Sequence, residues 1–498
     1  ERERERERET MLLSSFLGES STTILAGAAA VITVVAAGTL LSSSRSKKKK
    51  QLKRSWSFTS EGMRLGVFPP KVDAPPTMIN VILNLDDAPT VDDLCDQIVQ
   101  PLLQAEERFR MIPTPGGLRE SSAFEPKDLI RQVIVVKDES SMRYELDQIA
   151  LKQTALPDGM SRELPWWELV LVTNSKNKKA AVLLRFHHCL GDGLSLIQVF
   201  DDEGIIKTKE GSANKSKVTD ALLKKKRKKP SLSSIFEAIG HVATLPTTPH
   251  DAFESSKLRA SGSHFSLSQK WEVIYFPTVP LSYIKALKTA SKTSVNDVLM
   301  CAISQAIYEA SGGGGQCRAL LPVSLPRSTS HERMRNQFVM MSADIHANKT
   351  DIMDRLEAIR TTTSFLKSSP RAFIQLWMQN NIGSKLPTFL AQKTADDIFD
   401  RHSLVLTNVP GPEQVCLFAG KQVTEVQLLF PNVVPQVDLL SYAGSVYGNI
   451  IYDPQQVTMS LVTEKFVSSY AQAIVTMGQR LNVTDDVPKE LQQFIKKY

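Results

Sequence analysis

The hydrophobic positions of the chain follow two periods. Apolar residues at every second position, or in short unbroken runs, predict β-strands, and apolar residues three or four apart predict helices. Strands are predicted over MINVILNL, RQVIVVKD, WELVLVT, KAAVLLRFH, KWEVIYFPTV, CRALLPVSL, FVMMSADIH, SLVLTNV and SVYGNIIYD. Helices are predicted over VDDLCDQIVQPLLQAEERFR, GLSLIQVF, SVNDVLMCAISQAIYEA and SLVTEKFVSSYAQAIVTMGQRL. Strands mixed with helices occur in both halves, which predicts an α+β fold.

The segment between the two halves lacks this periodicity. It is rich in Lys, Ser and Gly, with one amphipathic stretch, SSIFEAIGHVATL. Such a composition is typical of a linker. We therefore predict an N-terminal domain over 56–205, a basic linker over 206–264 and a C-terminal domain over 265–498, within the two or three domains that 498 residues allow.

The first sixty residues have a different pattern. Residues 1–10, ERERERERET, read as an artificial leader, and residues 22–41 carry no charge over the length that crosses a bilayer. The basic run at 45–54 follows the apolar segment, and by the positive-inside rule it would keep the body on the cytosolic side. We expect a single transmembrane anchor at 22–41. A cleaved signal peptide and a hydrophobic tail that does not span the membrane are the alternatives.

Charge is concentrated in two short runs. The segments 45–54 and 224–229 carry thirteen positive charges, whereas the formal net charge of the whole chain is +7, so the remaining chain is mildly acidic. A nucleic-acid-binding body would carry positive charge over a whole face, so we exclude nucleic acid as a partner. The basic runs suit contact with anionic membrane lipid. For 224–229, a solvated run or a localisation signal is an equal alternative.

The cysteines and glycines give no sign of a metal or nucleotide cofactor. The five cysteines are odd in number and scattered, without a C-x-x-C pair, which argues against a disulfide framework or a zinc site and favours a reducing compartment. The glycine run at 312–315 follows a predicted helix, so it reads as a helix C-cap rather than a phosphate-binding loop.

The segment HHCLGDG, residues 187–193, is the main candidate for chemistry. Because side chains alternate along a strand, His187 and His188 point to opposite faces, and only one of them can face a given cavity. Gly191 and Gly193 permit a sharp turn, after which Asp192 can fold back to hold the loop or an arginine. A neutral imidazole at such a junction is a good general base. A core histidine, or a nucleophilic cysteine at 189, is the less favoured alternative.

This segment also carries a resemblance. HHCLGDG has the HHxxxDG form of CoA-dependent acyltransferases and condensation domains, and further segments resemble, in order, the wax ester synthase/diacylglycerol acyltransferase family. These segments are LPWWELVLV, SVNDVLMCAISQAI, LPVSLPRS, RNQFVMMSADI, TNVPGP and VYGNIIYDP. The chain departs from the family pattern at Trp166, where a smaller apolar residue is usual, and at Arg335, where a glycine is usual. No DFGWG-type segment is present, which argues against the plant phenolic branch.

The resemblance implies two chloramphenicol-acetyltransferase-like domains with a substrate tunnel between them. Acyl-CoA would enter from one side as co-substrate, and a fatty alcohol or diacylglycerol from the other. His188 would take the hydroxyl proton and return it to the CoA sulfur, without an acyl-enzyme or a further cofactor. The product chemistry fits an endoplasmic reticulum or lipid-droplet surface. Whether the protein is a homodimer stays open.

Asn296 and Asp297 fall in the first turn of a predicted helix. Ser294 and Asp297 have the spacing of a capping box, which by itself explains Asp297. Asn296 is a candidate for contact with substrate or with the catalytic loop.

Two further pairs are candidates for substrate binding. Thr407 and Asn408 end a predicted strand, where a hydroxyl could face the tetrahedral intermediate, although turn chemistry also accounts for them. Trp166 and Trp167 are candidates to line the acyl tunnel, and buried core positions are the alternative.

Two other functions stay open. One is a non-catalytic lipid-binding scaffold of the same fold. A scaffold would need neither a basic histidine nor an aspartate that fixes its loop, so the intact HHxxxDG segment disfavours it. The other is a condensation-type enzyme that acts on carrier-protein thioesters, although this chain has no room for a carrier module.

Overall fold

The computed structural model describes most of the chain after residue 57. The described residues are 58–65, 77–151, 164–208, 236–237, 240, 267–325, 334–457, 464–483, 488 and 491, with gaps at 115–116, 122–123, 136–138, 176–178, 269, 314 and 384–385. The predicted leader, the 22–41 anchor and most of the predicted 206–264 linker lie outside them.

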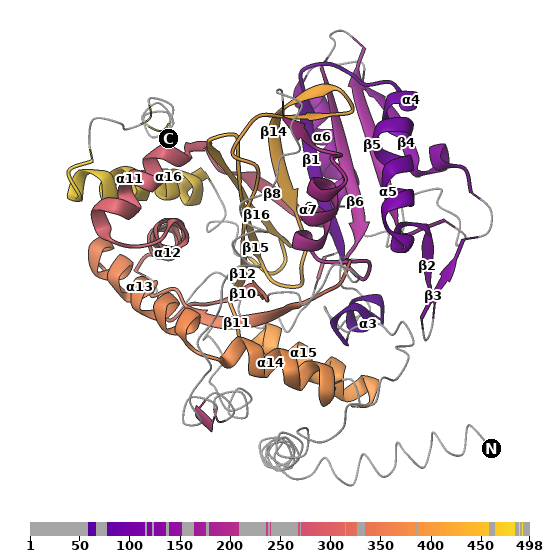
Figure 1. Cartoon of the computed structure of the whole chain (residues 1–498). Coiled ribbons are helices and arrows are strands. Elements are labelled where there is room, and N and C mark those ends of the chain that lie inside the picture. Colours follow the sequence, from indigo (N-terminus) through magenta and orange to yellow (C-terminus); the bar gives the residue numbers. More distant parts are fainter. Residues whose placement is uncertain are drawn as a thin grey trace.

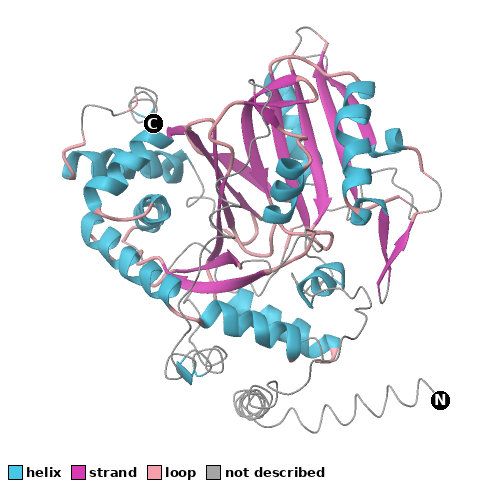
Figure 2. Cartoon of the chain, in the orientation of Figure 1, coloured by secondary structure: helices cyan, strands magenta, loops and turns pink. Residues whose placement is uncertain are grey.

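Two large sheets form the centre of the molecule (Figures 1 and 2). The first has the order β4 (Ile130–Val135), β5 (Trp167–Asn174), β6 (Ala180–His187), β1 (Met78–Leu85), β14 (Lys421–Leu429), β13 (Cys416–Phe418), β7 (Lys207–Thr208). The second has the order β11 (Phe338–Asp344), β10 (Arg318–Ser324), β12 (Leu404–Pro410), β15 (Gln436–Tyr442), β16 (Ser445–Tyr452), β8 (Glu272–Tyr275), and β9 (Val279–Pro280) also pairs with β16. A separate hairpin joins β2 (Met111–Thr114) and β3 (Gly117–Glu120).

The two halves of the sequence share the first sheet. Strand β14, from the second half, runs antiparallel beside β1, with Asn80 opposite Leu429 and Leu83 opposite Val426. The first sheet is therefore completed by residues more than 300 positions away, which ties the two halves together.

Strand β6 is central in the first sheet because both of its faces are apolar. All eight of its residues are buried. Leu184 and Phe186 pack into the core on one face, with the helical segment α4 (Val91–Leu94), a π-turn (Cys95–Val99) and α5 (Gln100–Ala105). Leu183 faces the other side, where it packs with α6 (Glu139–Leu151).

Helices cover one face of the second sheet. The core on this face includes residues of α11 (Leu281–Ser291), α12 (Val295–Ser311), α13 (Ile352–Ser368) and α16 (Glu464–Arg480). Alternate strand residues, among them Leu404 and Leu406 of β12 and Val437 and Leu439 of β15, pack against these helices. Because side chains alternate along a strand, the residues between them face the other way, toward the first sheet.

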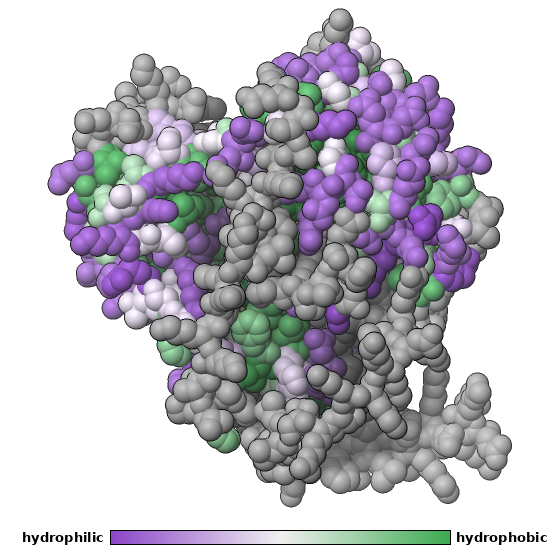
Figure 3. All heavy atoms as spheres, viewed as in Figure 1, coloured by the Kyte–Doolittle hydropathy of each residue, from purple (hydrophilic) through white to green (hydrophobic). Residues whose placement is uncertain are grey.

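The remaining helices border the space between the sheets. They are α3 (Phe58–Leu65), α7 (Gly193–Asp202), α14 (Arg371–Asn381) and α15 (Thr388–Asp400), and short 3₁₀ turns lie at Glu107–Arg110 and Pro126–Leu129. The predicted strands and helices are confirmed where they fall on described residues. Strands β14 and β15 and helices α6, α11, α13, α14 and α15 are among the elements that were not predicted. Figure 3 shows hydrophilic residues over much of both lobes and hydrophobic residues gathered near the centre of this face.

The predicted location is corrected. Among the helices that the structure describes, none combines the length and the apolar character required to cross a bilayer. For the described residues, this finding contradicts the prediction of a single-pass membrane protein of the endoplasmic reticulum or the lipid-droplet surface; the 22–41 segment lies outside them.

Candidate active site

His187 ends strand β6 and is part of the packed interior. Its side chain is buried, and its Nδ1 accepts the backbone N–H of Cys189 at 3.3 Å. Its Nε2 lies 3.5 Å from the hydroxyl of Thr77, and the Trp166 ring packs edge-on to its imidazole with 4.8 Å between ring centroids. His187 therefore has a full set of local contacts on the side of the strand away from the pocket.

His188 faces the space between the two sheets. Its backbone N–H donates to Thr77 O at 2.7 Å, which holds the residue at the end of the strand. Its ring packs near the rings of Phe338 and Phe430, with 5.4 and 5.6 Å between centroids. Its Nδ1 is buried and has no hydrogen-bond partner in the described part of the chain.

The surroundings of His188 favour a neutral imidazole. Burial lowers the pKa of His188 below its usual value of 6.5, and the nearby Asp192 carboxylate opposes this only in part. A neutral ring can accept a proton, which is what a general base requires.

Asp192 holds the turn that follows β6. It is the N-cap of α7, and its Oδ1 accepts both the backbone N–H and the hydroxyl of Ser195 at 2.9 Å. Its Oδ2 accepts the backbone N–H of Gln337 at 2.9 Å. The carboxylate therefore joins the loop that carries His188 to the segment that leads into β11, in the other half of the chain.

The two motif glycines have different surroundings. A Cβ at Gly191 would lie 3.0 Å from Met334 Cε, so this position is closely packed. A Cβ at Gly193 would meet nothing within 4 Å, and Gly193 lines the pocket. The missing side chain at 193 leaves room beside His188.

Asn336 is a functional candidate to which the sequence analysis gave no role. Its Nδ2 donates to the backbone carbonyl of His188 at 2.6 Å and to the hydroxyl of Ser60 at 2.9 Å. The backbone carbonyl of its neighbour Arg335 accepts the Ser195 hydroxyl at 2.7 Å. In the sequence, Asn336 was visible only as the Asn of the family-like segment RNQFVMMSADI. Its contact with His188 is seen only in the folded chain.

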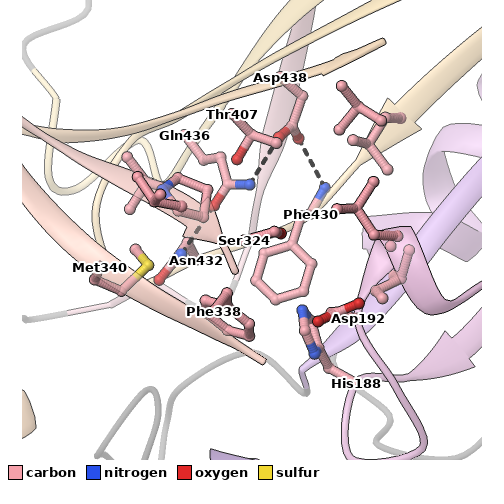
Figure 4. Close-up of a pocket in the computed structure, with 18 of the residues that line it drawn as sticks. His188, Asp192, Ser324, Phe338, Met340, Thr407, Phe430, Asn432, Gln436 and Asp438 are labelled. Carbon is pink, nitrogen blue, oxygen red and sulfur yellow. Dashed lines mark hydrogen bonds between the residues drawn. The ribbon is translucent and has the colours of Figure 1, made fainter. Parts of the chain in front are cut away.

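A pocket with a volume of about 660 Å³ opens beside His188 (Figure 4). This size is in the range of small-molecule sites. One wall, the N-terminal wall, carries His188, Asp192 and Gly193. The other, the C-terminal wall, is the face of β10, β12 and β15 that the helices leave uncovered, and it carries Ser324, Val405, Thr407, Gln436 and Asp438. Much of the remaining lining is apolar, including Met63, Ile79, Phe338, Met340, Leu428 and Phe430.

Asp438 is an ionisable group of the C-terminal wall that the sequence analysis missed. It is fully buried, and burial raises its pKa from 3.8 to about 7. Its carboxylate accepts from Gln436 Nε2 at 2.7 Å and from the backbone N–H of Phe430 at 3.0 Å. The only signal in the sequence was an acid inside the apolar run VVPQVDLL.

The predicted residues of the second half fall in two places. Thr407 and Asn408 line the pocket, and Asn408 Nδ2 donates to Asn296 Oδ1 at 3.3 Å, so Asn296 lies just behind the lining. Asp297 forms the predicted capping box with Ser294 and also accepts the hydroxyl of Thr363 at 2.7 Å. These contacts make Asp297 part of the start of α12, and it is not among the residues that line the pocket.

The two predicted tryptophans pack in the first half of the chain. Trp167 is fully buried, stacks on Phe186 with 5.6 Å between centroids, and donates from Nε1 to Phe109 O at 2.9 Å. Trp166 is half-buried against His187. Neither of them lines the pocket.

Other chemistries have less support at this site. Cys189 is buried in the core and does not line the pocket. In the part of the chain that the structure describes, no group of three or more His, Cys, Asp or Glu side chains could hold a metal ion.

Comparison with known protein families gives two matches. The wax ester synthase/diacylglycerol acyltransferase catalytic domain matches residues 143–263, and the C-terminal domain of the same family matches residues 334–473. Together they cover just over half of the chain and include the residues of both pocket walls except those of β10, such as Ser324.

Similar sequences and structures agree with this result. A probable diacylglycerol O-acyltransferase of Mycobacterium tuberculosis is 22% identical over 357 residues, which is 66% of this chain and 76% of the relative. The wax ester synthase/diacylglycerol acyltransferase of Marinobacter aquaeolei VT8 superposes with a TM-score of 0.55 at 14% identity, over 86% of this chain and 100% of that chain.

Two more distant structures share the fold. The trichothecene 15-O-acetyltransferase of Fusarium sporotrichioides gives a TM-score of 0.59 at 11% identity, over 85% of this chain and 94% of that chain. The epimerization domain of tyrocidine synthetase B gives 0.54 at 15% identity, over 89% and 100%. The mixed α/β fold is thus the one seen in two-domain acyltransferases, and the family matches show that the chain is an acyltransferase that belongs to the wax ester synthase/diacylglycerol acyltransferase family.

Proposed function

We propose that the protein transfers a fatty acyl group from acyl-CoA to the hydroxyl of a long-chain alcohol or a diacylglycerol, with His188 as the general base. The observation that carries this proposal is a buried imidazole with a lowered pKa at the edge of a largely apolar pocket. The names of the family and of the mycobacterial relative support the two acceptor classes.

The proposed reaction has one transfer step through a tetrahedral intermediate. The acceptor hydroxyl gives its proton to His188 while its oxygen attacks the thioester carbonyl carbon. When the intermediate collapses, the carbon–sulfur bond breaks, and His188 returns the proton to the CoA sulfur. A base in this position contributes a factor on the order of 10²–10⁴ to the rate.

Other residues would position the reacting groups. Asp192 and Asn336 fix the loop and the backbone of His188, and such fixed geometry favours reaction between two bound substrates. The Thr407 hydroxyl lines the pocket and has no hydrogen-bond partner among the described residues, so it is free to donate to the oxyanion. The apolar lining would hold the acyl chain and keep water out.

The test is acceptor-dependent release of CoA thiol by the purified protein. Palmitoyl-CoA is the donor, and hexadecanol and dioleoylglycerol are supplied in turn, with the ester product identified by mass. The proposal expects thiol release that depends on an acceptor. A folded protein that releases no thiol with either acceptor, but accepts a palmitoylated carrier protein as donor, would contradict the proposal in favour of carrier-protein thioesters.

A further inference from the structure

The C-terminal wall carries a carboxyl group, Asp438, that acyl transfer by His188 does not use. Thr407 of β12 and Asp438 of β15 are directly paired in the parallel register, so their side chains lie next to each other on the face of the pocket. In Figure 4 they lie at one end of the pocket and His188 and Asp192 at the other, with the Phe430 ring between them. We call Gln436 and Asp438 the polar rung.

The polar rung is held in place by a chain of hydrogen bonds. Asn432 Nδ2 donates to Gln436 Oε1 at 2.8 Å, and Gln436 Nε2 donates to Asp438 Oδ1 at 2.7 Å. Asp438 Oδ2 accepts from the Phe430 N–H. A carboxylate offers about four lone-pair sites, of which these bonds use two.

The lone-pair sites of Asp438 that accept no hydrogen bond from the protein point to a ligand with a hydrogen-bond donor. In the described part of the chain no Lys or Arg pairs with Asp438. A carboxyl group in an apolar wall is costly unless hydrogen bonds compensate for the loss of water. An O–H group of a bound molecule would supply such a bond.

The acceptors of the proposed function differ in whether they can supply it. A simple alcohol and a diacylglycerol each have one O–H, which the reaction places at His188, and ester carbonyls only accept hydrogen bonds. A glycerol that carries one alkyl or acyl chain has two free hydroxyls. In the binding mode proposed below, one of them meets His188 while the other reaches the polar rung.

We propose that the polar rung is a subsite for a second hydroxyl of the acyl acceptor, so that diols of the monoalkyl- or monoacylglycerol type are preferred over acceptors with one hydroxyl. This inference rests on the proposed function. Sites built to hydrogen-bond a substrate hydroxyl discriminate strongly against analogues without it, because the buried polar groups then stay unpaired.

The test compares two acceptors that differ by one hydroxyl. These are 2-O-hexadecylglycerol and 2-hexadecyloxypropan-1-ol, with palmitoyl-CoA as donor and thiol release as readout. The wild type is expected to give a kcat/KM at least about tenfold higher for the diol, as for loss of one hydrogen bond to a charged group. Two equivalent hydroxyls alone would account for only twofold.

A substitution at Asp438 tests whether the preference for the diol depends on the polar rung. Asp438→Asn keeps the shape of the side chain but loses one acceptor oxygen, so the ratio of kcat/KM for the diol to kcat/KM for the mono-ol should fall to about twofold. Asp147→Asn is the matched control, because Asp147 is a half-buried carboxyl on α6 that accepts the hydroxyl of Tyr275 at 2.5 Å outside the pocket. This control should keep the wild-type preference.

The outcomes separate the two proposals. Equal kcat/KM for both acceptors in the wild type overturns the subsite and leaves the proposed function intact, and this comparison holds even if Asp438→Asn does not fold. A preference that survives in folded Asp438→Asn also overturns it. No thiol release with any acceptor overturns the proposed function, and the subsite with it.

Discussion

At the N-terminal wall of the pocket, His188 and Asp192 lie where strand β6 gives way to helix α7, whereas at the C-terminal wall Thr407 and Asp438 lie along the face of two paired strands. The first arrangement depends on a turn, so a few consecutive residues define it. The second depends on alternation, so its residues come from three strands that are separated in sequence. The end of a strand thus provides one reactive side chain and the carboxylate that fixes its loop. The face of paired strands provides a binding surface made of several side chains.

Burial acts on the two walls in opposite directions. It lowers the pKa of His188 and raises that of Asp438 to about 7, because in both cases the charged form loses contact with water. His188 is therefore mainly neutral at physiological pH, whereas Asp438 is only partly ionised. We expect His188 to determine the rate with every acceptor, and Asp438 to determine which acceptor is preferred.

The largest expected effect is the loss of the base. His188→Asn should lower kcat/KM by about 10²–10⁴ with every acceptor, measured by thiol release. The matched control is His346→Asn, because His346 is another partly buried histidine with a lowered pKa that bonds Thr362 away from the pocket. Asparagine also tolerates the positive φ of 53° at that position. Equal losses of kcat/KM in the two variants would contradict the role of His188 as the general base.

The next effect concerns the C-terminal wall. Thr407→Val replaces the hydroxyl with a methyl group of similar size. If that hydroxyl donates to the oxyanion, kcat should fall about 10²-fold. Ser324→Ala removes another pocket hydroxyl on the same face and should change kcat by less than about threefold. A Thr407→Val variant that changes only KM would show that Thr407 binds substrate without acting on the transition state.

A smaller effect should follow from loosening the link between the walls. Asp192→Asn can still cap α7 but cannot accept the Gln337 N–H with its amide nitrogen, so kcat/KM should fall about tenfold, with about 1 kcal/mol of stability lost. Asp351→Asn changes the N-cap of α13, away from the pocket, and should affect the melting temperature alone. If Asp192→Asn lost only stability too, Asp192 would be an ordinary helix cap.

The smallest effect is a change in the pH dependence of stability. The folded-state pKa of Asp438, about 7, lies above its usual 3.8, so the folded protein binds this proton more tightly than the unfolded chain does. Its contribution to stability is full below about pH 4 and is lost as pH rises toward 7. Urea unfolding from pH 5 to 8 should therefore show a weaker decline for Asp438→Asn than for the wild type, and parallel curves would contradict the raised pKa.

The sequence was most informative where the structure is local. The strand–turn–helix at 187–193 was predicted because alternation, glycines and an N-cap residue all lie within a few positions, and the capping box of Ser294 and Asp297 was predicted for the same reason. Nine strand segments were predicted because their buried runs are apolar, whereas β14 and β15, in which polar residues interrupt the apolar pattern, were missed.

The sequence was least informative where distant segments meet. The pairing of β14 with β1 and the bond from Asn336 to His188 join residues that no local pattern connects. Helices α13 to α15 were missed because their exposed faces interrupt the apolar pattern. Asp438 could not be recognised as part of a site until β15 was placed beside β12.

The pH dependence of wild-type kcat/KM tests the central claim most directly, because it reports the ionisation of the base in the free enzyme without any change to the pocket. It should be measured with an acceptor that has one hydroxyl, so that Asp438 meets no second donor. We predict an acid limb whose midpoint lies below 6.5, the usual pKa of histidine, and a constant value from there to pH 8. A midpoint above 6.5, or the absence of an acid limb, would contradict a buried neutral His188 as the base.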